Sequence, residues 1–481
     1  MWIVALGIVM FLFLLGGCST DEAAPGSTPS SNHRHDSSAD GGTTSETKPA
    51  ATLWGAPELT DENPDPDVVE VHLTAAKGRA TLDGKEIDVL AYNGSVPGPI
   101  LRAKQHQTVI VHFTNQLAEP TTVHWHGLRI PEAMDGSPVI QTPVPPGGTF
   151  TYSFMVPDAG SFWYHPHVNT YAQLARGLYG AIVVEGAPDP AYDLERSLIL
   201  DDVLFDADGN ISPPTLDGLV PLTGRVGKVL LTNGKAAARA KASATKGKVE
   251  RWRIVNSANA RTMRLLLEGA KGRLIGADGG LFTAPVPLPE RLVLPVGGRV
   301  EIEVSYDTAG TARLVNAVPT SSVEEKTTML EVAVADGPAP RTIAWPTITP
   351  AVAERPAVDD FDISFDYQQG SSITWTVNGE SNPKEPLFTV AKGATVKITL
   401  SNASAVMDHP FHLHGQFFRV NDPAWPGLRD TVLVPAAKPI EIIAYLDNPG
   451  MWMAHCHILE HAEVGMMAHI MVLGDGDTMG H

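Results

Sequence analysis

Short stretches of alternating apolar and polar residues run through most of the chain from Val68 onward. In segments 108–113 and 149–154, Val, Ile, Phe and Tyr are interleaved with Thr, His and Ser. Gly, Pro, Asn and Asp separate such segments, and helical periodicity is scarce. Because successive side chains of a strand point to opposite faces, the pattern predicts strands with one buried face. Many short strands divided by turn residues predict an all-β chain of sandwich or barrel domains.

The first and last thirds of the chain share one plan. Segment 107–116 is followed by His-Trp-His-Gly at 124–127, and segment 394–403 is followed by His-Leu-His-Gly at 412–415. Such an internal repeat indicates that one structural unit occurs more than once.

A second match supports the repeat. Segment 146–167 ends in His-Pro-His, and segment 435–457 ends in His-Cys-His at a similar distance from a Pro-containing turn. The middle third echoes the plan in 249–256 and 294–301, but no histidine occurs between His167 and His409. We therefore predict three related domains, of which the middle one lacks the histidine chemistry.

The first residues form a short apolar run that ends Leu15-Gly16-Gly17-Cys18. The run is too short for a comfortable membrane-spanning helix and predicts a secretion signal. Its end resembles a bacterial lipobox, in which the cysteine is lipidated, although the start lacks Lys and Arg and Gly16 is an uncommon choice. The alternative is a plain signal peptide cut nearby. Either interpretation predicts an exported protein of the periplasm or cell envelope. The lipobox interpretation adds a lipid on Cys18 that would anchor the protein to a membrane.

Residues 19–67 are rich in Ser, Thr, Pro, Gly, Asp and Ala and poor in large apolar residues. Such a composition cannot bury enough surface to fold, so it predicts a disordered tether. Turn-rich stretches near 185–188 and 336–340 predict the later boundaries. The predicted organisation is a signal segment, a tether and three domains: 1–18, 19–67, 68–188, 189–340 and 341–476.

The chain of 481 residues has a formal net charge of −19. Phosphate binding requires a basic surface, so this charge argues against nucleic acid as a partner. The chain has two cysteines, Cys18 and Cys456. If Cys18 is lipidated or removed, Cys456 has no obvious disulfide partner.

Cys456 lies in a stretch, 455–467, that also holds three histidines and two methionines. A lone cysteine is often a buried structural residue. Two imidazoles and one thiolate with a long, weak thioether bond form a blue-copper site, and this stretch carries all three ligand types.

Strand geometry sorts the candidate ligands into two groups. Residues two apart on a strand face the same way, so each His-x-His pair projects into one cavity, while Cys456 points to the other side. His409 is three residues from His412 and is expected to face away from the cavity as well. The cavity group is His124, His126, His165, His167, His412, His414, His455 and His457. The second group is His409, Cys456, His461 and one methionine. Eight imidazoles are too many for one first-row metal ion and suit two or three, held where the first and last domains meet.

These four motifs, their order and the empty middle third resemble those of the three-domain, laccase-like multicopper oxidases over roughly Val68 to Leu473. The resemblance implies three cupredoxin-like Greek-key β-sandwich domains and four coppers per chain. It implies a type 1 copper on His409, Cys456, His461 and axial Met466, and a type 2 copper on His124 and His412. It implies two type 3 coppers, one on His126, His165 and His457, the other on His167, His414 and His455.

The resemblance also implies a reaction. A reducing substrate would give single electrons to the type 1 site through the exposed edge of His461 or His409. Cys456 would pass them to its neighbours His455 and His457, and O2 would be reduced to two waters. Asp135 resembles a family acid that assists with protons, although it is also a suitable turn former before Gly136. An acid that some relatives carry after the last type 1 histidine is replaced here by Ala462, and Glu460 and Glu463 are the candidates to substitute for it.

The resemblance implies O2 and a small organic reductant, such as a phenol or an aromatic amine, as partners. The alternative within the family is a cuprous-ion oxidase for copper tolerance. Such enzymes often carry a methionine-rich insert, whereas residues 338–403 contain no methionine. Met407, Met451 and Met453 keep Cu(I) as a possible substrate. Outside the family, the alternatives are a copper-free cupredoxin scaffold, which the complete ligand set argues against, and a simple electron carrier, which would leave the eight cavity histidines without use.

Overall fold

The computed structural model describes residues 56–236, 238–319, 324–339, 341–404, 407–436 and 438–477. Almost all regular structure in them is strand, which confirms the predicted all-β class. The strands form six sheets, two in each third of the chain, and no sheet crosses residues 188 or 340. The exact domain boundaries stay predictions. No helix in the described ranges is both long and apolar enough to span a bilayer.

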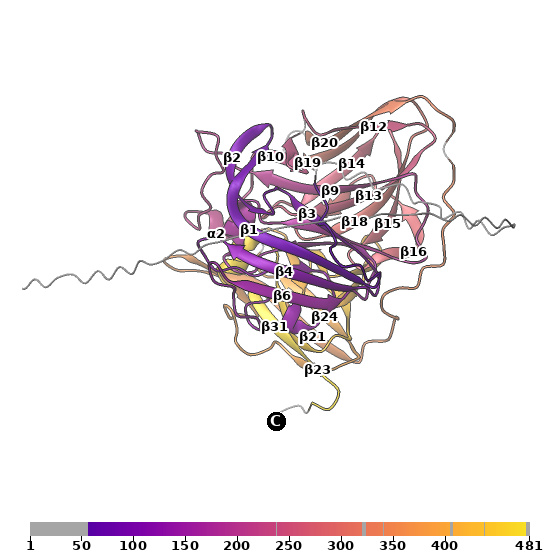
Figure 1. Ribbon diagram of the computed structural model, residues 1–481. Helices are drawn as coiled ribbons and strands as arrows, with labels where there is room; N and C mark the ends of the chain where they lie inside the picture. Colours follow the sequence, from indigo (N-terminus) through magenta and orange to yellow (C-terminus); the bar gives the residue numbers. More distant parts are fainter. Residues whose placement is uncertain are drawn as a thin grey trace, which may run out of the picture. The chain divides into compact units, whose positions relative to one another are not determined.

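The first third forms two four-stranded sheets, shown in indigo to magenta in Figure 1. One has the order β2 (Lys85–Tyr92), β1 (Val68–Leu82), β4 (Thr108–Gln116), β6 (Thr149–Met155). The other has the order β3 (Gly98–Lys104), β8 (Gly180–Glu185), β7 (Gly160–His165), β5 (His124–His126). In β4 every second residue from Val109 to Asn115 is buried, which is the alternation that the sequence predicted.

The middle third forms a seven-stranded and a five-stranded sheet. The larger has the order β11 (Lys235–Ala236), β10 (Val229–Thr232), β9 (Leu194–Val203), β13 (Val249–Asn256), β18 (Arg299–Ser305), β15 (Lys271–Ala277), β16 (Gly280–Pro287). The smaller has the order β12 (Lys241–Thr245), β20 (Glu324–Ala335), β19 (Gly310–Pro319), β14 (Met263–Glu268), β17 (Leu292–Leu294).

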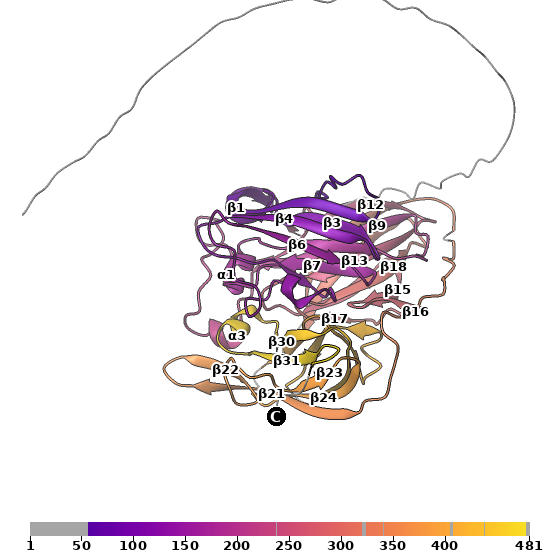
Figure 2. The same ribbon diagram turned by 60° about the horizontal axis from the view of Figure 1, so that its bottom comes forward.

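The last third, orange to yellow in Figure 2, forms a six-stranded and a five-stranded sheet. The first has the order β22 (Ile373–Val377), β21 (Asp359–Gln369), β24 (Ala394–Asn402), β29 (Ile440–Leu446), β26 (Phe417–Val420), β27 (Leu428–Arg429). The second has the order β23 (Thr389–Ala391), β31 (Met467–Leu473), β30 (Gly450–Cys456), β25 (His409–Leu413), β28 (Thr431–Val434).

The sequence repeat is also a repeat of topology. In each third the first long strand pairs in parallel with a later one: β1 with β4, β9 with β13, and β21 with β24. Each second sheet carries one more parallel pair at its edge: β3 with β8, β12 with β20, and β23 with β31. The three largest buried apolar clusters draw mainly on one third each. The middle third therefore has the same plan as its neighbours, as its sequence echoes predicted.

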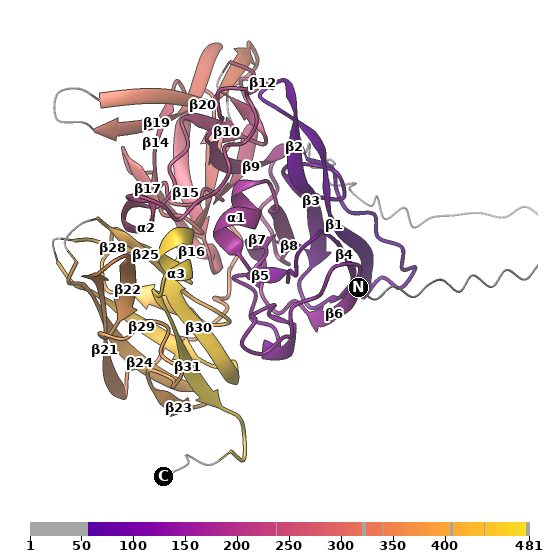
Figure 3. The ribbon, with the colours of Figure 1, turned by 90° about the vertical axis from the view of Figure 1, so that its left-hand side faces the viewer.

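The described residues form four short helical segments in the connections between strands: η1 (Glu132–Met134), α1 (Thr170–Ala175), α2 (Val220–Thr223) and α3 (Leu459–Glu463). Helix α3, which follows the His-Cys-His motif, contacts both α1 of the first third and α2 of the middle third (Figure 3). The three thirds therefore come together beside the motif that the sequence singled out.

The predicted tether is ordered at its C-terminal end. Ala56 is buried, Glu58 forms a β-bridge with Ile100, and the Leu59 N–H donates to the Ile100 carbonyl at 2.9 Å. The prediction of disorder up to residue 67 is therefore wrong for 56–67, because main-chain pairing with β3 holds a segment whose side chains bury little. The signal segment, Cys18 and the tether up to residue 55 lie outside the described residues.

Candidate metal centre

Eight buried histidines from the first and last thirds meet at the ends of four strands. The first third supplies two from β5 and two at the end of β7, and the last third supplies two at the end of β25 and two at the end of β30. Their ring nitrogens form three groups whose ligand atoms lie within 4.8 Å of one another: His124, His126 and His412; His126, His165 and His457; and His167, His414 and His455. Each group mixes the two thirds, so neither third holds a complete site alone.

Hydrogen bonds fix which ring nitrogen is free to bind a metal. His124, His165, His412 and His455 each donate from Nδ1 to a backbone carbonyl at 2.8 to 2.9 Å. A carbonyl can only accept, so Nδ1 carries the proton and Nε2 keeps its lone pair. Within the described residues Nε2 of His124, His165 and His412 has no hydrogen-bond partner. Orphaned lone pairs that converge in a buried cavity fit a metal cluster, with the carbonyls orienting the rings.

The electrostatics of the cavity keep the rings neutral. Burial, together with the neighbouring imidazoles, holds the pKa of His126, His165, His167, His414 and His457 well below the ordinary value. Burial lowers the pKa of His455 to about 3. Only the neutral ring binds a metal, so the cluster is in ligand form at neutral pH.

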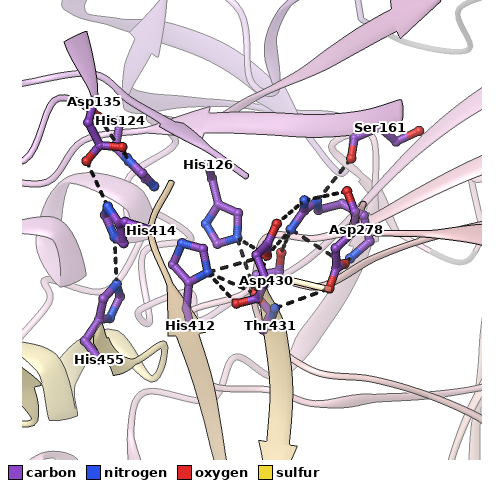
Figure 4. Close-up of polar contacts among 12 residues, drawn as sticks. His124, His126, Asp135, Ser161, Asp278, His412, His414, Asp430, Thr431 and His455 are labelled. Carbon is purple, nitrogen blue, oxygen red and sulfur yellow. Dashed lines mark hydrogen bonds and ion pairs between the residues drawn. The ribbon is translucent and has the colours of Figure 1, made fainter. Parts of the chain in front are cut away.

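Asp135 contacts two of these histidines from different thirds. Its Oδ2 accepts from His414 Nδ1 at 2.9 Å, and its backbone carbonyl accepts from His124 Nδ1 at 2.8 Å (Figure 4). The residue is 2 % exposed and follows η1, so it is also the turn residue that the alternative interpretation described. The turn aims the carboxylate at the cluster, and the part that Asp135 takes in proton supply stays a prediction.

The sequence did not predict Asp430, which lies between β27 and β28 beside the cluster. Its carboxylate accepts from Arg299 Nη1 and Nη2, both at 2.6 Å, and its backbone carbonyl accepts from His412 Nδ1 at 2.9 Å (Figure 4). Although burial opposes it, Arg299 holds the pKa of Asp430 well below its usual range. Arg299 comes from β18 of the middle third, which therefore supports the cluster without supplying a ligand.

A glycine makes room for this ion pair. At Gly127, which follows His126 and has φ +90°, an added Cβ would lie 2.2 Å from Arg299 Nη2 and 2.7 Å from Asp430 Oδ2. The Gly of the His-Trp-His-Gly motif is therefore required by the close approach of the Arg299–Asp430 pair. In the sequence Arg299 is only a charged residue at the start of a predicted strand. Nothing near it in the sequence indicated that Asp430 is its partner.

The second ligand group forms on the far side of β30. Cys456 Sγ lies 3.6 Å from His409 Nδ1 and 3.7 Å from His461 Nδ1, and the two nitrogens are 3.3 Å apart. All three residues are fully buried. Burial raises the pKa of the Cys456 thiol and lowers that of His409 to about 3. Met466 is also fully buried, and its carbonyl accepts from the Cys456 N–H at 3.1 Å.

The expectation of an exposed imidazole edge is wrong, because the middle third covers this group. His461 Nε2 donates to the Leu222 carbonyl in α2 at 3.1 Å, and both His461 and His409 are 0 % exposed. Trp375 stacks on His461 at 4.3 Å between ring centroids. We call Leu219–Gly224 the α2 cap. No pattern in the sequence linked this segment to the site.

The two glutamates proposed to replace the acid missing at Ala462 have other surroundings. Glu460 is buried, and its Oε1 accepts from Asn259 Nδ2 of the middle third at 2.8 Å. Glu463 is exposed. No described hydrogen bond or ion pair joins either one to the eight histidines.

Known proteins share this arrangement. Two family models, both described as multicopper oxidase, match residues 74–189 and 356–475. The multicopper oxidase MmcO of Mycobacterium tuberculosis is 30 % identical over 444 residues, which cover 84 % of this chain and 86 % of the relative. Laccase-1 of Botryotinia fuckeliana is 29 % identical over 80 % of this chain and 78 % of the relative.

A solved structure agrees. A multicopper oxidase from Campylobacter jejuni, described as a metallo-oxidase, superposes with a TM-score of 0.78 at 27 % identity, over 88 % of this chain and 95 % of that chain. The chain belongs to the multicopper oxidase family. It is a copper-dependent oxidoreductase of cupredoxin-like β-sandwiches that uses O2 as electron acceptor, which confirms the predicted fold class, enzyme class and cofactor.

Proposed function

We propose that the two buried ligand groups hold four coppers in the roles predicted from the motifs. The type 1 copper is assigned to His409, Cys456, His461 and axial Met466. The type 2 copper is assigned to His124 and His412. The type 3 coppers are assigned to His126, His165 and His457, and to His167, His414 and His455. The observation that carries the proposal is the separation of a thiol-containing group from three imidazole groups that share one cavity.

Copper, when bound, supplies the one-electron transfers and the four-electron reduction of O2 to water. The chain supplies the connection between the group that contains Cys456 and the cluster of eight histidines. Cys456 belongs to the outer group, and its covalent neighbours His455 and His457 belong to the cluster, so a short peptide path joins them. Asp135 supplies the carboxylate beside the cluster. Its Oδ2 holds His414 in position and its backbone carbonyl holds His124, so Oδ1, which has no hydrogen-bond partner among the described residues, is the atom at which it would take up a proton.

We propose phenols and aromatic amines as the reductants, with a long electron step through the α2 cap. The route would run from an outer-surface donor through the Leu222 carbonyl and its hydrogen bond to His461. Leu219, at the start of the α2 cap, is 68 % exposed and offers an apolar contact for an aromatic ring. Similarity to a laccase supports organic substrates.

Cu(I) is the second candidate substrate. Similarity to a metallo-oxidase supports it, and Met407 packs against the apolar cluster that contains Cys456. Steady-state O2 consumption with Cu(I) and with a phenol, measured on the same preparation, ranks the two. A kcat/KM for Cu(I) at least about tenfold above that for every phenol tested would replace the first candidate by the second.

The assignment is tested with Cys456→Ser. The parent protein is expected to bind four coppers and to show the intense visible band of a thiolate–copper site. The variant is expected to lose that band and one copper and to consume O2 with a reductant at a small fraction of the parent rate. Oxidation at the parent rate would contradict the electron route.

We propose export and lipid anchoring on the apolar start and Leu15-Gly16-Gly17-Cys18 alone. Fractionation of cells that express the full chain is expected to place it in the envelope, and Cys18→Ser is expected to release it to the soluble exported fraction. Retention of the variant in the membrane would contradict the lipid anchor.

A further inference from the structure

A cavity of about 370 Å³ lies between the middle and last thirds, apart from the copper-ligand groups and the α2 cap. Its walls are mainly apolar and include Leu274, Val286, Leu292, Pro426 and Trp425. Pro287, Pro289 and Ala424 also line it and are exposed, so the cavity opens to solvent. A concave apolar site with few polar groups is the usual setting for a small organic ligand.

One polar group in the wall has no hydrogen-bond partner. Arg429 is 2 % exposed, and its Nε is buried without a partner among the described residues. Its guanidinium lies 5.1 Å from the centre of the Trp425 ring. A buried guanidinium without hydrogen bonds is costly, so structures normally pair it with a carboxylate.

The two carboxylates whose charge acts on Arg429, Asp278 and Asp430, make their hydrogen bonds to other groups. Arg299 binds both oxygens of Asp430, and Asp278 accepts from the Arg299 and Thr431 N–H groups at 2.6 and 3.3 Å. Arg291, the other arginine in the wall, is held by Glu324 and the Ala317 carbonyl. The group with an unmet hydrogen bond is therefore Arg429 Nε, and the cavity beside it has space for the apolar body of an acceptor.

We propose that this cavity binds a small aromatic carboxylate, with its carboxylate on Arg429 and its ring among the apolar walls. The site is distinct from the reductant surface, because the α2 cap supplies none of its lining. It is nevertheless close to the cluster: Arg429 precedes Asp430, whose carbonyl accepts from His412 Nδ1. Occupancy is expected to change the maximal rate rather than to compete with the reductant.

Calorimetric titration of the copper-loaded full chain with benzoate tests the proposal. Benzoate is expected to bind with one site per chain, and its uncharged counterpart benzyl alcohol at least about tenfold more weakly, because only the carboxylate can form a charge-assisted hydrogen bond with Arg429. Sulfate should not displace benzoate. Equal binding of benzyl alcohol, displacement by sulfate at similar concentration, or no saturable heat would each overturn the proposal.

Variants separate this cavity from the coppers. Ala424→Glu places a negative charge at the mouth and is expected to weaken benzoate binding about tenfold, whereas the matched neutral Ala424→Gln keeps it within about threefold. Both should leave the basal oxidase rate unchanged, because Ala424 contacts no copper-ligand group. Arg429→Gln is expected to abolish binding. If that variant does not fold, the Ala424 pair decides alone, and equal binding by its two members would overturn the proposal.

Discussion

At the scale of single residues, the site depends on neutral imidazoles and one buried ion pair. Carbonyl acceptors fix the tautomers of four histidines, and burial lowers the pKa of the cluster's rings so that they stay neutral. Arg299 balances Asp430 directly behind His412. These are side-chain properties of the folded state, and each predicts a measurable result.

Arg299→Met is expected to lower the free energy of unfolding of the copper-free protein by roughly 3–5 kcal/mol, because it leaves the Asp430 carboxylate buried without its partner. Denaturant unfolding measures the change. Arg313→Met is the matched control: Arg313 pairs with Glu331 but its side chain is 42 % exposed, so the loss should stay below about 1 kcal/mol. Equal losses in the two variants would contradict the role of Arg299.

The copper-free protein is expected to lose stability as the pH falls below about 6.5, the ordinary pKa of histidine. Above that pH the rings are neutral in both states. Below it, the unfolded chain takes up protons that the folded cluster excludes, so the free energy of unfolding falls. For His455 this window extends down to its folded pKa of about 3. Each such histidine contributes roughly 1.4 kcal/mol per pH unit, and denaturant midpoints that do not change between about pH 7.5 and about pH 5.5 would contradict the prediction.

At the scale of elements, the ligands lie where strands end. Only β5 carries both histidines of its pair within the strand, whereas His167, His414 and His457 lie just beyond β7, β25 and β30. The α2 cap lies in the connection between β9 and β10, and two backbone carbonyls of its four-residue helix accept from Trp375 Nε1 and His461 Nε2. Strand ends thus present the predicted ligands, and a connecting segment covers His461.

Gly224→Ala tests the α2 cap. Gly224 has φ +68°, and an added Cβ would lie 2.5 Å from Ala260 Cβ and 2.7 Å from Ile458 Cγ2, so the cap must shift away from His461. The KM for a bulky phenol is expected to fall severalfold, with the KM for O2 unchanged, in steady-state oxygen-electrode assays. Gly218→Ala is the control, because Gly218 has φ +63° but open space around its Cβ. The same change in both variants would mean that strain, and not the position of the cap, alters the KM.

At the scale of the whole molecule, three repeats of one topology have different tasks. The outer two supply the proposed copper ligands, and the middle one supplies Arg299, the α2 cap and part of the Arg429 cavity. The copper-ligand groups therefore join parts of the chain that are hundreds of residues apart.

Removal of copper is expected to lower the melting temperature, because ions that bind only the folded state stabilise it by about 4 kcal/mol at a free concentration of 1,000 times Kd. Calorimetry of copper-loaded and copper-free protein measures the shift. Re-addition of copper should restore the higher value in the parent chain and restore less of it in Cys456→Ser. A melting temperature that does not depend on copper would contradict the prediction that bound copper ions link the first and last thirds of the chain.

The sequence by itself determined the strand pattern, the three-fold repeat and the two ligand groups, because alternation along a strand and the spacing of His-x-His pairs are local properties. It failed where distant segments meet. The pairing of residues 57–59 with β3, the Arg299–Asp430 pair and the α2 cap over His461 each join parts of the chain with no common local signal. Only the tertiary structure decided these contacts, since burial and charge pairing depend on which surfaces the packed sheets bring together.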